Sequence, residues 1–194
     1  MGKVKIVLIG EEAVGKTTLR KKFMGEKFPV SYLATIGADF AKKDIRLILE
    51  GKEYLIEVLI WDLAGQDSYK LIRESFYEGS AGALLVVDIT RRDTFNAAEK
   101  WIDELWKNSG SEPVPFVILA NKADLRKTNP EKTIGPEETM GLVEEVRSHA
   151  RKQANFKYSF LETSGASGVN VDKAFETLVR EILVLANSKD VKKV

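Results

Sequence analysis

Short apolar runs recur along the chain, and longer stretches with apolar positions every three or four residues separate them. Short continuous apolar runs are typical of strands that are buried on both faces of a parallel sheet. Two other runs alternate apolar and polar positions and are joined only by Gly51-Lys52, so they predict an antiparallel pair. The predicted strands are residues 4–9, 41–50, 54–62, 83–88, 115–120 and 158–161.

The stretches between these strands predict helices, the first over residues 17–23. Thr90 with Asp93 three residues later has the pattern of a capping box, which would open a second helix. Pro136 is favoured at a first helical position, and Asn170 is a favourable residue to cap the last helix. The apolar faces expected on these helices are Phe95, Ala98, Ile102 and Leu105; Met140, Val143, Val146 and Ala150; and Val171, Phe175, Leu178 and Ile182.

Strands and helices that alternate in this way predict an α/β fold. Right-handed crossovers would place six strands in one doubly wound sheet, mostly parallel with one antiparallel strand, flanked by five helices. We expect residues 1–186 to form one domain and residues 187–194 to be a short flexible tail. Ligands of such sheets bind beyond the carboxyl ends of the strands, so the side chains there are the candidates for function.

Composition limits the functions that are open to the chain. Thirty basic and 29 acidic side chains leave a net charge of +1, which gives no global attraction to nucleic acid. Cysteine is absent, which excludes thiol catalysis, disulfides, prenylation and palmitoylation and fits a reducing compartment. The sequence has neither an apolar run of membrane-spanning length nor a signal-peptide pattern. We therefore expect a monomeric cytoplasmic protein without a direct lipid anchor, which reaches membranes only through a partner.

Residues 10–17 match the pattern G-x-x-x-x-G-K-[ST] between a predicted strand and a predicted helix. Glycine at both turns lets the backbone N–H groups point inward around a phosphate chain. Lys16 adds positive charge at the terminal phosphates, and the hydroxyl of Thr17 is placed to ligate Mg²⁺. The nucleotide-binding residues predicted in this loop are Glu12, Ala13, Val14, Gly15, Lys16, Thr17 and Thr18.

The third predicted strand ends in the sequence WDLAGQ at residues 61–66. The carboxylate of Asp62 is a candidate ligand of Mg²⁺, usually through a water molecule. Gly65 can present its N–H to a γ-phosphate, and Gln66 can orient an attacking water. We therefore predict Gln66 and Lys16 as catalytic residues, Gly65 as a nucleotide contact and Asp62 as a metal ligand.

The fifth predicted strand ends in Asn121-Lys122-Ala123-Asp124. The Asp124 carboxylate can accept two parallel hydrogen bonds from N1–H and the exocyclic amine of guanine, a donor pair that adenine lacks. Adenine would leave a buried charge unpaired, which costs on the order of several kcal/mol. The predicted base-binding residues are Asn121, Lys122 and Asp124, together with Ser164, Gly165 and Ala166 in the small-residue turn after the sixth strand.

Residues 25–39 form an interval long enough to be a functional loop. Phe28 in this loop either packs edge-on against the base or belongs to the core, and we favour the base contact. Tyr32 is a further candidate nucleotide contact. Thr35 can close over the metal and the γ-phosphate, so we predict it both as a catalytic residue and as a metal ligand.

Together these motifs resemble the small GTPases of the Ras superfamily over about residues 3–185, and within the superfamily they resemble the Rab family most. The sequences that carry the resemblance are GEEAVGKT at 10–17, TIG at 35–37, WDLAGQ at 61–66, NKAD at 121–124 and ETS at 162–164. The resemblance implies a G domain of the P-loop NTPase class. It also implies a switch that binds GTP or GDP with Mg²⁺ and slowly hydrolyses GTP.

The same resemblance implies partners. Effector, exchange-factor and activating proteins would bind two loops at about residues 28–40 and 63–78, which the γ-phosphate orders when GTP is bound. Phe40, Trp61 and Tyr77 match three aromatic residues that Rab proteins present to effectors. Alternatively, these aromatic side chains are partly core.

The chain departs from the family pattern at several positions. Glu12 stands where a small residue is usual, and its carboxylate could repel the γ-phosphate or intercept an arginine finger. Asp67 replaces the Glu typical of Rab proteins, and Gly165-Ala166 replaces the usual Ala-Lys. A nucleotide-gated binding module with little intrinsic hydrolysis is therefore the alternative function. A third hypothesis, an ATP-using phosphate-loop enzyme, is disfavoured by Asp124.

Overall fold

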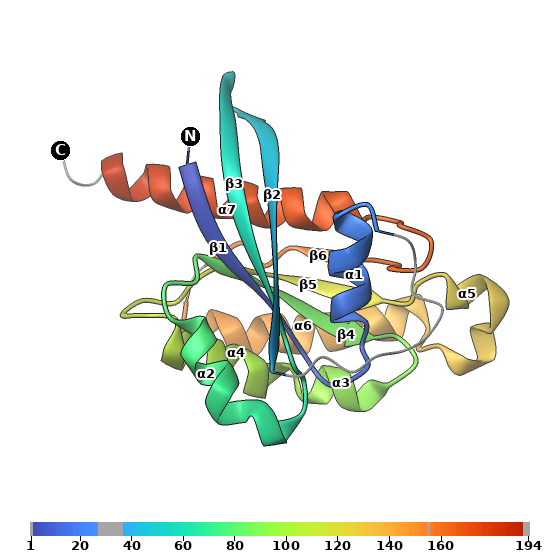
Figure 1. Cartoon of the computed structure of the whole chain (residues 1–194). Coiled ribbons are helices and arrows are strands. Elements are labelled where there is room, and N and C mark those ends of the chain that lie inside the picture. The colour runs from blue at the N-terminus through green and yellow to red at the C-terminus, as the bar shows by residue number, and fades with distance from the viewer. Residues whose placement is uncertain (1, 27–36, 155, 192–194) are drawn as a thin grey trace.

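The backbone of the protein, in a computed structural model that describes residues 2–26, 37–154 and 156–191, is organised around one six-stranded sheet (Figure 1). The strands lie in the order β2-β3-β1-β4-β5-β6, with β2 antiparallel to β3 and every other neighbouring pair parallel. The predicted doubly wound α/β fold with one antiparallel strand is confirmed. The strands are β1 (Gly2–Ile9), β2 (Ala38–Leu49), β3 (Lys52–Leu63), β4 (Gly82–Asp88), β5 (Phe116–Asn121) and β6 (Phe160–Glu162).

Helices cover both faces of this sheet. They are α1 (Lys16–Phe23), α2 (Lys70–Tyr77), α3 (Arg92–Asn96), α4 (Ala98–Asn108), α5 (Leu125–Thr128), α6 (Pro136–Arg151) and α7 (Val171–Val191), with 3-10 turns at Asp67–Tyr69 and Pro130–Lys132. The helices α1 and α7 pack on one face, and α2, α4 and α6 pack on the other (Figure 1). In β1, Ile6 and Leu8 belong to the first core layer, whereas Val7 and Ile9 belong to the second. This alternation explains why residues 6–9 of the strand are all apolar and buried.

Two predicted helix details are wrong. The hydroxyl of Thr90 donates to Asp88 Oδ1 at 2.7 Å, and α3 begins after Arg91 without a side-chain cap. Met140 is 46% exposed, and Thr139 takes the inward position instead. Thr139 tolerates burial because its hydroxyl donates to the Gly135 carbonyl oxygen at 2.9 Å.

The last helix begins directly after Asn170, the residue predicted to cap it. Asn170 precedes α7 with a left-handed backbone (φ 56°), and its side-chain amide donates to the Glu162 carbonyl oxygen at 2.7 Å. It therefore ties the end of β6 to the start of α7. The helix continues to Val191, so part of the tail expected at residues 187–194 is helical.

The carboxyl ends of the parallel strands converge on one edge of the sheet. The phosphate loop follows β1, Asp62 ends β3, Asn121 ends β5 and Thr163 follows β6. Since β3, β1, β4, β5 and β6 are consecutive neighbours, the segments that carry the predicted site residues lie along a single edge.

Candidate nucleotide site

The phosphate loop is shaped by two close approaches that only glycine permits. A Cβ on Gly10, which has φ 131°, would lie 2.2 Å from the Val86 carbonyl oxygen. A Cβ on Gly15, which has φ 100°, would lie 2.4 Å from the side-chain amide of Asn121. The loop therefore packs directly against β4 and β5, and α1 begins at Lys16 with its free N–H groups facing the loop.

Lys16 is buried inside this loop. Its Nζ donates to the Gly10 carbonyl oxygen at 2.7 Å and to the Glu11 carbonyl oxygen at 2.8 Å. Burial lowers the pKa of Lys16 from 10.5 to about 8, although the nearby Asp62 carboxylate opposes that change. An ammonium group has three donors, so one remains for a phosphate oxygen.

Asp62 and Thr17 form the candidate metal site. Asp62 is fully buried, and burial raises its pKa. Among the described residues, neither carboxylate oxygen has a hydrogen bond of regular geometry. The Thr17 side chain is nevertheless close enough to lower the pKa of Asp62, and Arg20 Nε lies 3.9 Å from Asp62 Oδ2. A buried carboxylate beside a hydroxyl fits the oxygen ligands that Mg²⁺ prefers.

Protein ligands for a metal ion are few at this place. Within the described ranges, no group of three or more acidic, histidine or cysteine side chains could hold a metal ion alone. Mg²⁺ usually keeps waters and takes substrate phosphate oxygens as its remaining ligands. The residues present therefore fit a metal ion that binds together with a phosphate chain.

Gly65 and Gln66 lie against the phosphate loop. A Cβ on Gly65 would be 2.5 Å from the Glu12 backbone nitrogen, so the two segments touch. Gln66 Nε2 donates to Glu12 Oε1 at 2.7 Å. Gln66 Oε1 is buried and accepts no hydrogen bond from any described residue. The amide is thus held at one end by the unusual Glu12, while its acceptor oxygen is unused.

The base-binding residues surround a cavity of about 200 Å³. Asn121 holds its rim together, because its Nδ2 donates to the Val14 carbonyl oxygen at 2.8 Å and its Oδ1 accepts the Gly165 N–H at 3.2 Å. Ser164 Oγ donates to Asp124 Oδ1 at 2.5 Å. The cavity is lined by Gly15, Thr18, Asn121, Lys122, Asp124, Leu125, Gly165 and Ala166.

Gly165, which departs from the family pattern, is explained by its surroundings. A Cβ at this position would lie 2.8 Å from Thr18 Cγ2 and 3.3 Å from the Leu19 backbone nitrogen. The turn after β6 therefore approaches α1 so closely that any side chain would push the two apart. Glycine keeps the rim of the cavity closed.

The structure brings most of the predicted site residues together. The loop residues Glu12 to Thr18, the pair Gly65 and Gln66, Asp62 and the base-binding residues all lie at the same edge of the sheet. Phe28, Tyr32 and Thr35 lie outside the described residues, so their roles stay predictions.

The predicted aromatic surface is wrong at one position. Tyr77 is fully buried, and its hydroxyl donates to Glu104 Oε1 at 2.9 Å. Phe76 instead packs on Trp61, with ring centroids 4.8 Å apart, and Phe40 lies 5.0 Å from the same indole ring. Adjacent helical residues point about 100° apart, so only one of two neighbouring aromatics can face the sheet edge.

The sequence analysis also missed Arg73 and Trp101. Arg73 is fully buried in α2 and donates to backbone oxygens on both sides of Gly65. Trp101 Nε1 donates to Glu11 Oε1, at 2.9 Å, in the phosphate loop. The one available signal was the spacing of Arg73 and Tyr77, which lie four residues apart and so share a helix face.

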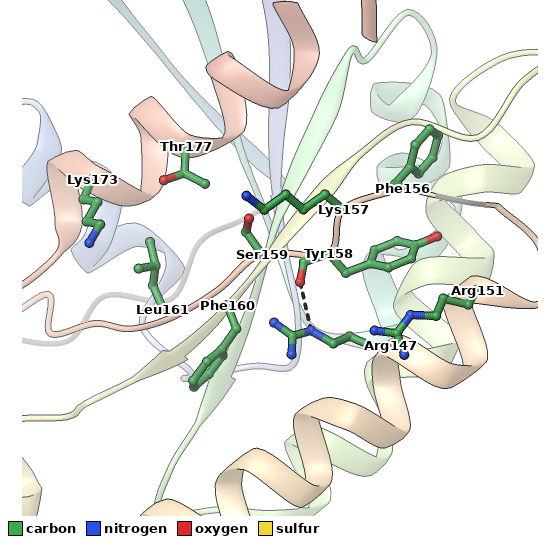
Figure 2. A pocket seen from close by; sticks show the side chains of 10 residues that line it. All are labelled: Arg147, Arg151, Phe156, Lys157, Tyr158, Ser159, Phe160, Leu161, Lys173 and Thr177. Atoms are coloured by element: carbon green, nitrogen blue, oxygen red, sulfur yellow. Dashed lines mark hydrogen bonds between the residues drawn. The ribbon is translucent and has the colours of Figure 1, made fainter. Parts of the chain in front are cut away.

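A larger hollow of about 490 Å³ lies between α6 and α7, beside β6. Figure 2 shows basic side chains from both helices around it, with Arg147 Nε donating to the Tyr158 carbonyl oxygen at 2.8 Å. None of the predicted site residues lines it. The candidate nucleotide site is therefore the smaller cavity at the carboxyl edge of the sheet.

No helix within the described residues has both the length and the apolar character needed to cross a membrane.

Comparison with known proteins adds the following relationships. The family model described as "Ras family" matches residues 5–184. The chain is 36% identical over 185 residues to Ras-related protein Rab2BV of Beta vulgaris, an alignment that covers 95% of this chain and 78% of that protein.

Two further relatives have similar coverage. Ras-related protein RABA5b of Arabidopsis thaliana is 39% identical over 178 residues, covering 92% of this chain and 74% of the relative. Ras-related protein RGP2 of Oryza sativa subsp. japonica is 37% identical over 185 residues, covering 95% of this chain and 77% of the relative.

Proposed function

The chain belongs to the Ras family of small GTPases, close to its Rab members, and from this premise we propose that it is a Mg²⁺-dependent switch that binds GTP and GDP. Family membership makes it a GTPase. We further propose that GTP orders the loops at about residues 28–40 and 63–78 into a surface for effectors, and that hydrolysis to GDP and phosphate releases them.

The base cavity is the observation that carries this proposal. Asp124 lies on its rim with one carboxylate oxygen accepting the Ser164 hydroxyl, which fixes the orientation of the carboxylate. A fixed carboxylate can accept the two donors of a guanine edge, and adenine offers no such pair. A backbone N–H of the turn after β6 would meet the O6 acceptor on the same edge; the Gly165 N–H would have to leave Asn121 Oδ1 to do so.

The phosphate end supplies charge and positioning. Lys16 would hold the terminal phosphates with its remaining donor, and α1 would contribute its N-terminal N–H groups. Thr17, Asp62 and the predicted Thr35 would hold Mg²⁺, which neutralises charge that develops on the phosphates. Gln66 would orient the attacking water through its unused Oε1, and Lys16 would stabilise the transferred group.

A slow intrinsic rate is part of the proposal. The hydrogen bond from Gln66 Nε2 to Glu12 holds the catalytic amide at the phosphate loop. This contact also supports the alternative function, a nucleotide-gated binding module that hydrolyses GTP hardly at all. The two functions differ only in the rate of phosphate release, not in which nucleotide binds.

Proposed partners follow from the exposed apolar side chains near the switch loops. Phe40 is 47% exposed, and Leu71 and Ile72 on α2 are also exposed. Together with Trp61 and Phe76 they form an apolar surface suited to an effector or a regulator. We propose a cytoplasmic monomer that meets membranes through such partners.

The test is the affinity of the purified protein for GDP and for ADP with Mg²⁺, measured by calorimetry. We expect GDP to bind roughly a thousandfold more tightly or better, because a site built for a hydrogen-bonding edge rejects analogues that lack it. Equal affinity for the two nucleotides would contradict the proposal and favour an ATP-using enzyme.

A further inference from the structure

We propose that Arg73 is a positioning residue that aims the backbone N–H of Gly65 at the γ-phosphate of GTP and thereby sets the preference for GTP over GDP. This inference rests on the proposed function. Arg73 lies on α2 with no exposed surface, and it touches neither the base cavity nor Lys16 among the hydrogen bonds of the described residues. Its effect on the nucleotide would be transmitted through the backbone.

One nitrogen of Arg73 donates hydrogen bonds to the residues on both sides of Gly65 in the sequence. Nη1 donates to the Ala64 carbonyl oxygen at 2.9 Å and to the Gln66 carbonyl oxygen at 3.1 Å. The Ala64 carbonyl and the Gly65 N–H belong to one peptide unit, which is planar and trans. Because the two groups point in opposite directions, fixing the carbonyl toward Arg73 fixes the N–H away from it.

Gly65 itself lies against the phosphate loop, beside the place where a γ-phosphate would bind. Gly65 packs so tightly there that a Cβ would lie 2.5 Å from the Glu11 carbonyl carbon and the Glu12 backbone nitrogen. A cation on the carbonyl side also polarises the peptide, which strengthens its N–H as a donor. Arg73 therefore both orients the γ-phosphate donor and increases its strength.

Arg73 is itself fixed by two neighbours, Glu104 and Trp101. Glu104 on α4 accepts Nε at 2.6 Å and Nη2 at 3.1 Å, a two-point contact that sets the plane of the guanidinium. The guanidinium carbon lies 4.3 Å from the centre of the Trp101 ring. Because Trp101 Nε1 donates to Glu11 Oε1, the same cluster is anchored to the phosphate loop that it serves.

A purely structural role explains this arrangement less well. A buried ion pair contributes little to stability compared with well-packed apolar side chains of similar size. An apolar pair could join α2 to α4 equally well, but it could not donate to the two carbonyl groups around Gly65. The guanidinium, rather than the packing, is what the Gly65 segment requires.

The test uses Arg73→Met/Glu104→Gln, which removes both charges and leaves an acceptor for the Tyr77 hydroxyl. Affinities for GDP and for a non-hydrolysable GTP analogue are measured with Mg²⁺ in wild type and variant. We expect GDP affinity to change less than about twofold and affinity for the analogue to fall about tenfold, the effect of one well-oriented hydrogen bond to a charged group.

Two single variants make the test specific. Tyr77→Phe removes a different hydrogen bond to the same Glu104 and leaves the bonds to Ala64 and Gln66, so its ratio of the two affinities should match wild type. Arg73→Lys keeps the charge beside Glu104 but replaces the planar fork, so its ratio should move in the same direction as in the double variant. It also gives an answer if the double variant unfolds.

An unchanged ratio of the two affinities in both Arg73 variants would overturn the inference, provided that GDP still binds. Failure of wild type to bind GDP would instead overturn the proposed function. The ratio separates positioning from general destabilisation, because a loosened fold weakens both nucleotides alike.

Discussion

At the base end of the site Asn121 and Asp124 are already hydrogen-bonded to the groups that define the cavity, whereas at the phosphate end Lys16 and Gln66 are bonded to the phosphate loop itself. At the base end these bonds hold both side chains in place. The phosphate end can change partners, because each of its donors has an alternative acceptor within the protein. We infer that identity of the nucleotide is read by the fixed end and its phosphate number by the adjustable end.

The two ends also differ in how deeply their charged side chains are buried. Lys16 and Asp62 are both buried. Burial lowers the pKa of Lys16 and raises the pKa of Asp62, so in both it favours the neutral form. The base end has its one carboxylate, Asp124, at a partly exposed rim. Buried charges without partners cost free energy, so we expect the phosphate end to be stabilised strongly when a phosphate anion and a metal cation bind together.

The largest loss of nucleotide affinity is expected at Asp124. Asp124→Ala removes the acceptor of the guanine edge, and removing one partner of a desolvated charged contact costs roughly 2–5 kcal/mol, so GDP affinity should fall by a factor of about thirty to several thousand. Calorimetry with GDP measures it. Asp103→Ala, an exposed carboxylate on α4 that contacts His149, serves as the control and should bind GDP like wild type. Retained affinity in Asp124→Ala would show that the base is read elsewhere.

The pH dependence of binding tests the phosphate end alone, because burial lowers the pKa of Lys16 to about 8. The pKa of Lys16 in the folded protein is about 8, below its ordinary 10.5, so the free protein loses this proton as the pH rises through 8, whereas a phosphate chain favours its retention. GDP affinity should therefore be flat below about pH 8 and fall above it, by at most about tenfold per pH unit for one proton.

The measurement is GDP affinity from pH 6.5 to 9.5 in EDTA, so that no metal ion contributes. Lys16→Arg replaces the titrating amine by a guanidinium that stays charged, and any fall that remains in this variant belongs to the base. Identical profiles for wild type and Lys16→Arg would contradict the assignment.

The smallest expected effect is at Glu12. Glu12→Ala frees the Gln66 amide and removes a negative charge beside the γ-phosphate, so GTP hydrolysis should accelerate roughly two- to tenfold, the value of one net hydrogen bond. Glu12→Gln keeps an acceptor but removes the charge, so it separates the two causes. Slower hydrolysis in Glu12→Ala would mean that Glu12 positions Gln66 for the water instead of restraining it.

The base end could be predicted from the sequence because its residues fall in two short motifs, each directly after a strand. Asn121 and Asp124 follow directly from a buried strand, and the rules for sheet topology place the end of that strand at the ligand edge. The phosphate loop was predictable for the same reason. The position of each motif at the ligand edge depends on the strand that precedes it, not on the side chains that pack around it.

The adjustable end was less predictable, because its contacts join distant segments. Nothing in the spacing of Glu12 and Gln66 indicates that their side chains meet, and the contact between Glu11 and Trp101 joins residues 90 positions apart. The choice of Phe76 over Tyr77 for the exposed aromatic position depends on the rotation of α2, which the buried Arg73 fixes. Tertiary packing decides such details, and periodicity alone does not contain them.

The most direct test of the account is single-turnover hydrolysis of GTP by wild type and by Gln66→Leu, each with and without Mg²⁺. The account predicts phosphate release by wild type that depends on Mg²⁺ and is about a hundredfold faster than in Gln66→Leu, while both proteins bind GDP equally. Equal rates in the two proteins, or release that is indifferent to Mg²⁺, would contradict the assignment of the adjustable end as the site of GTP hydrolysis.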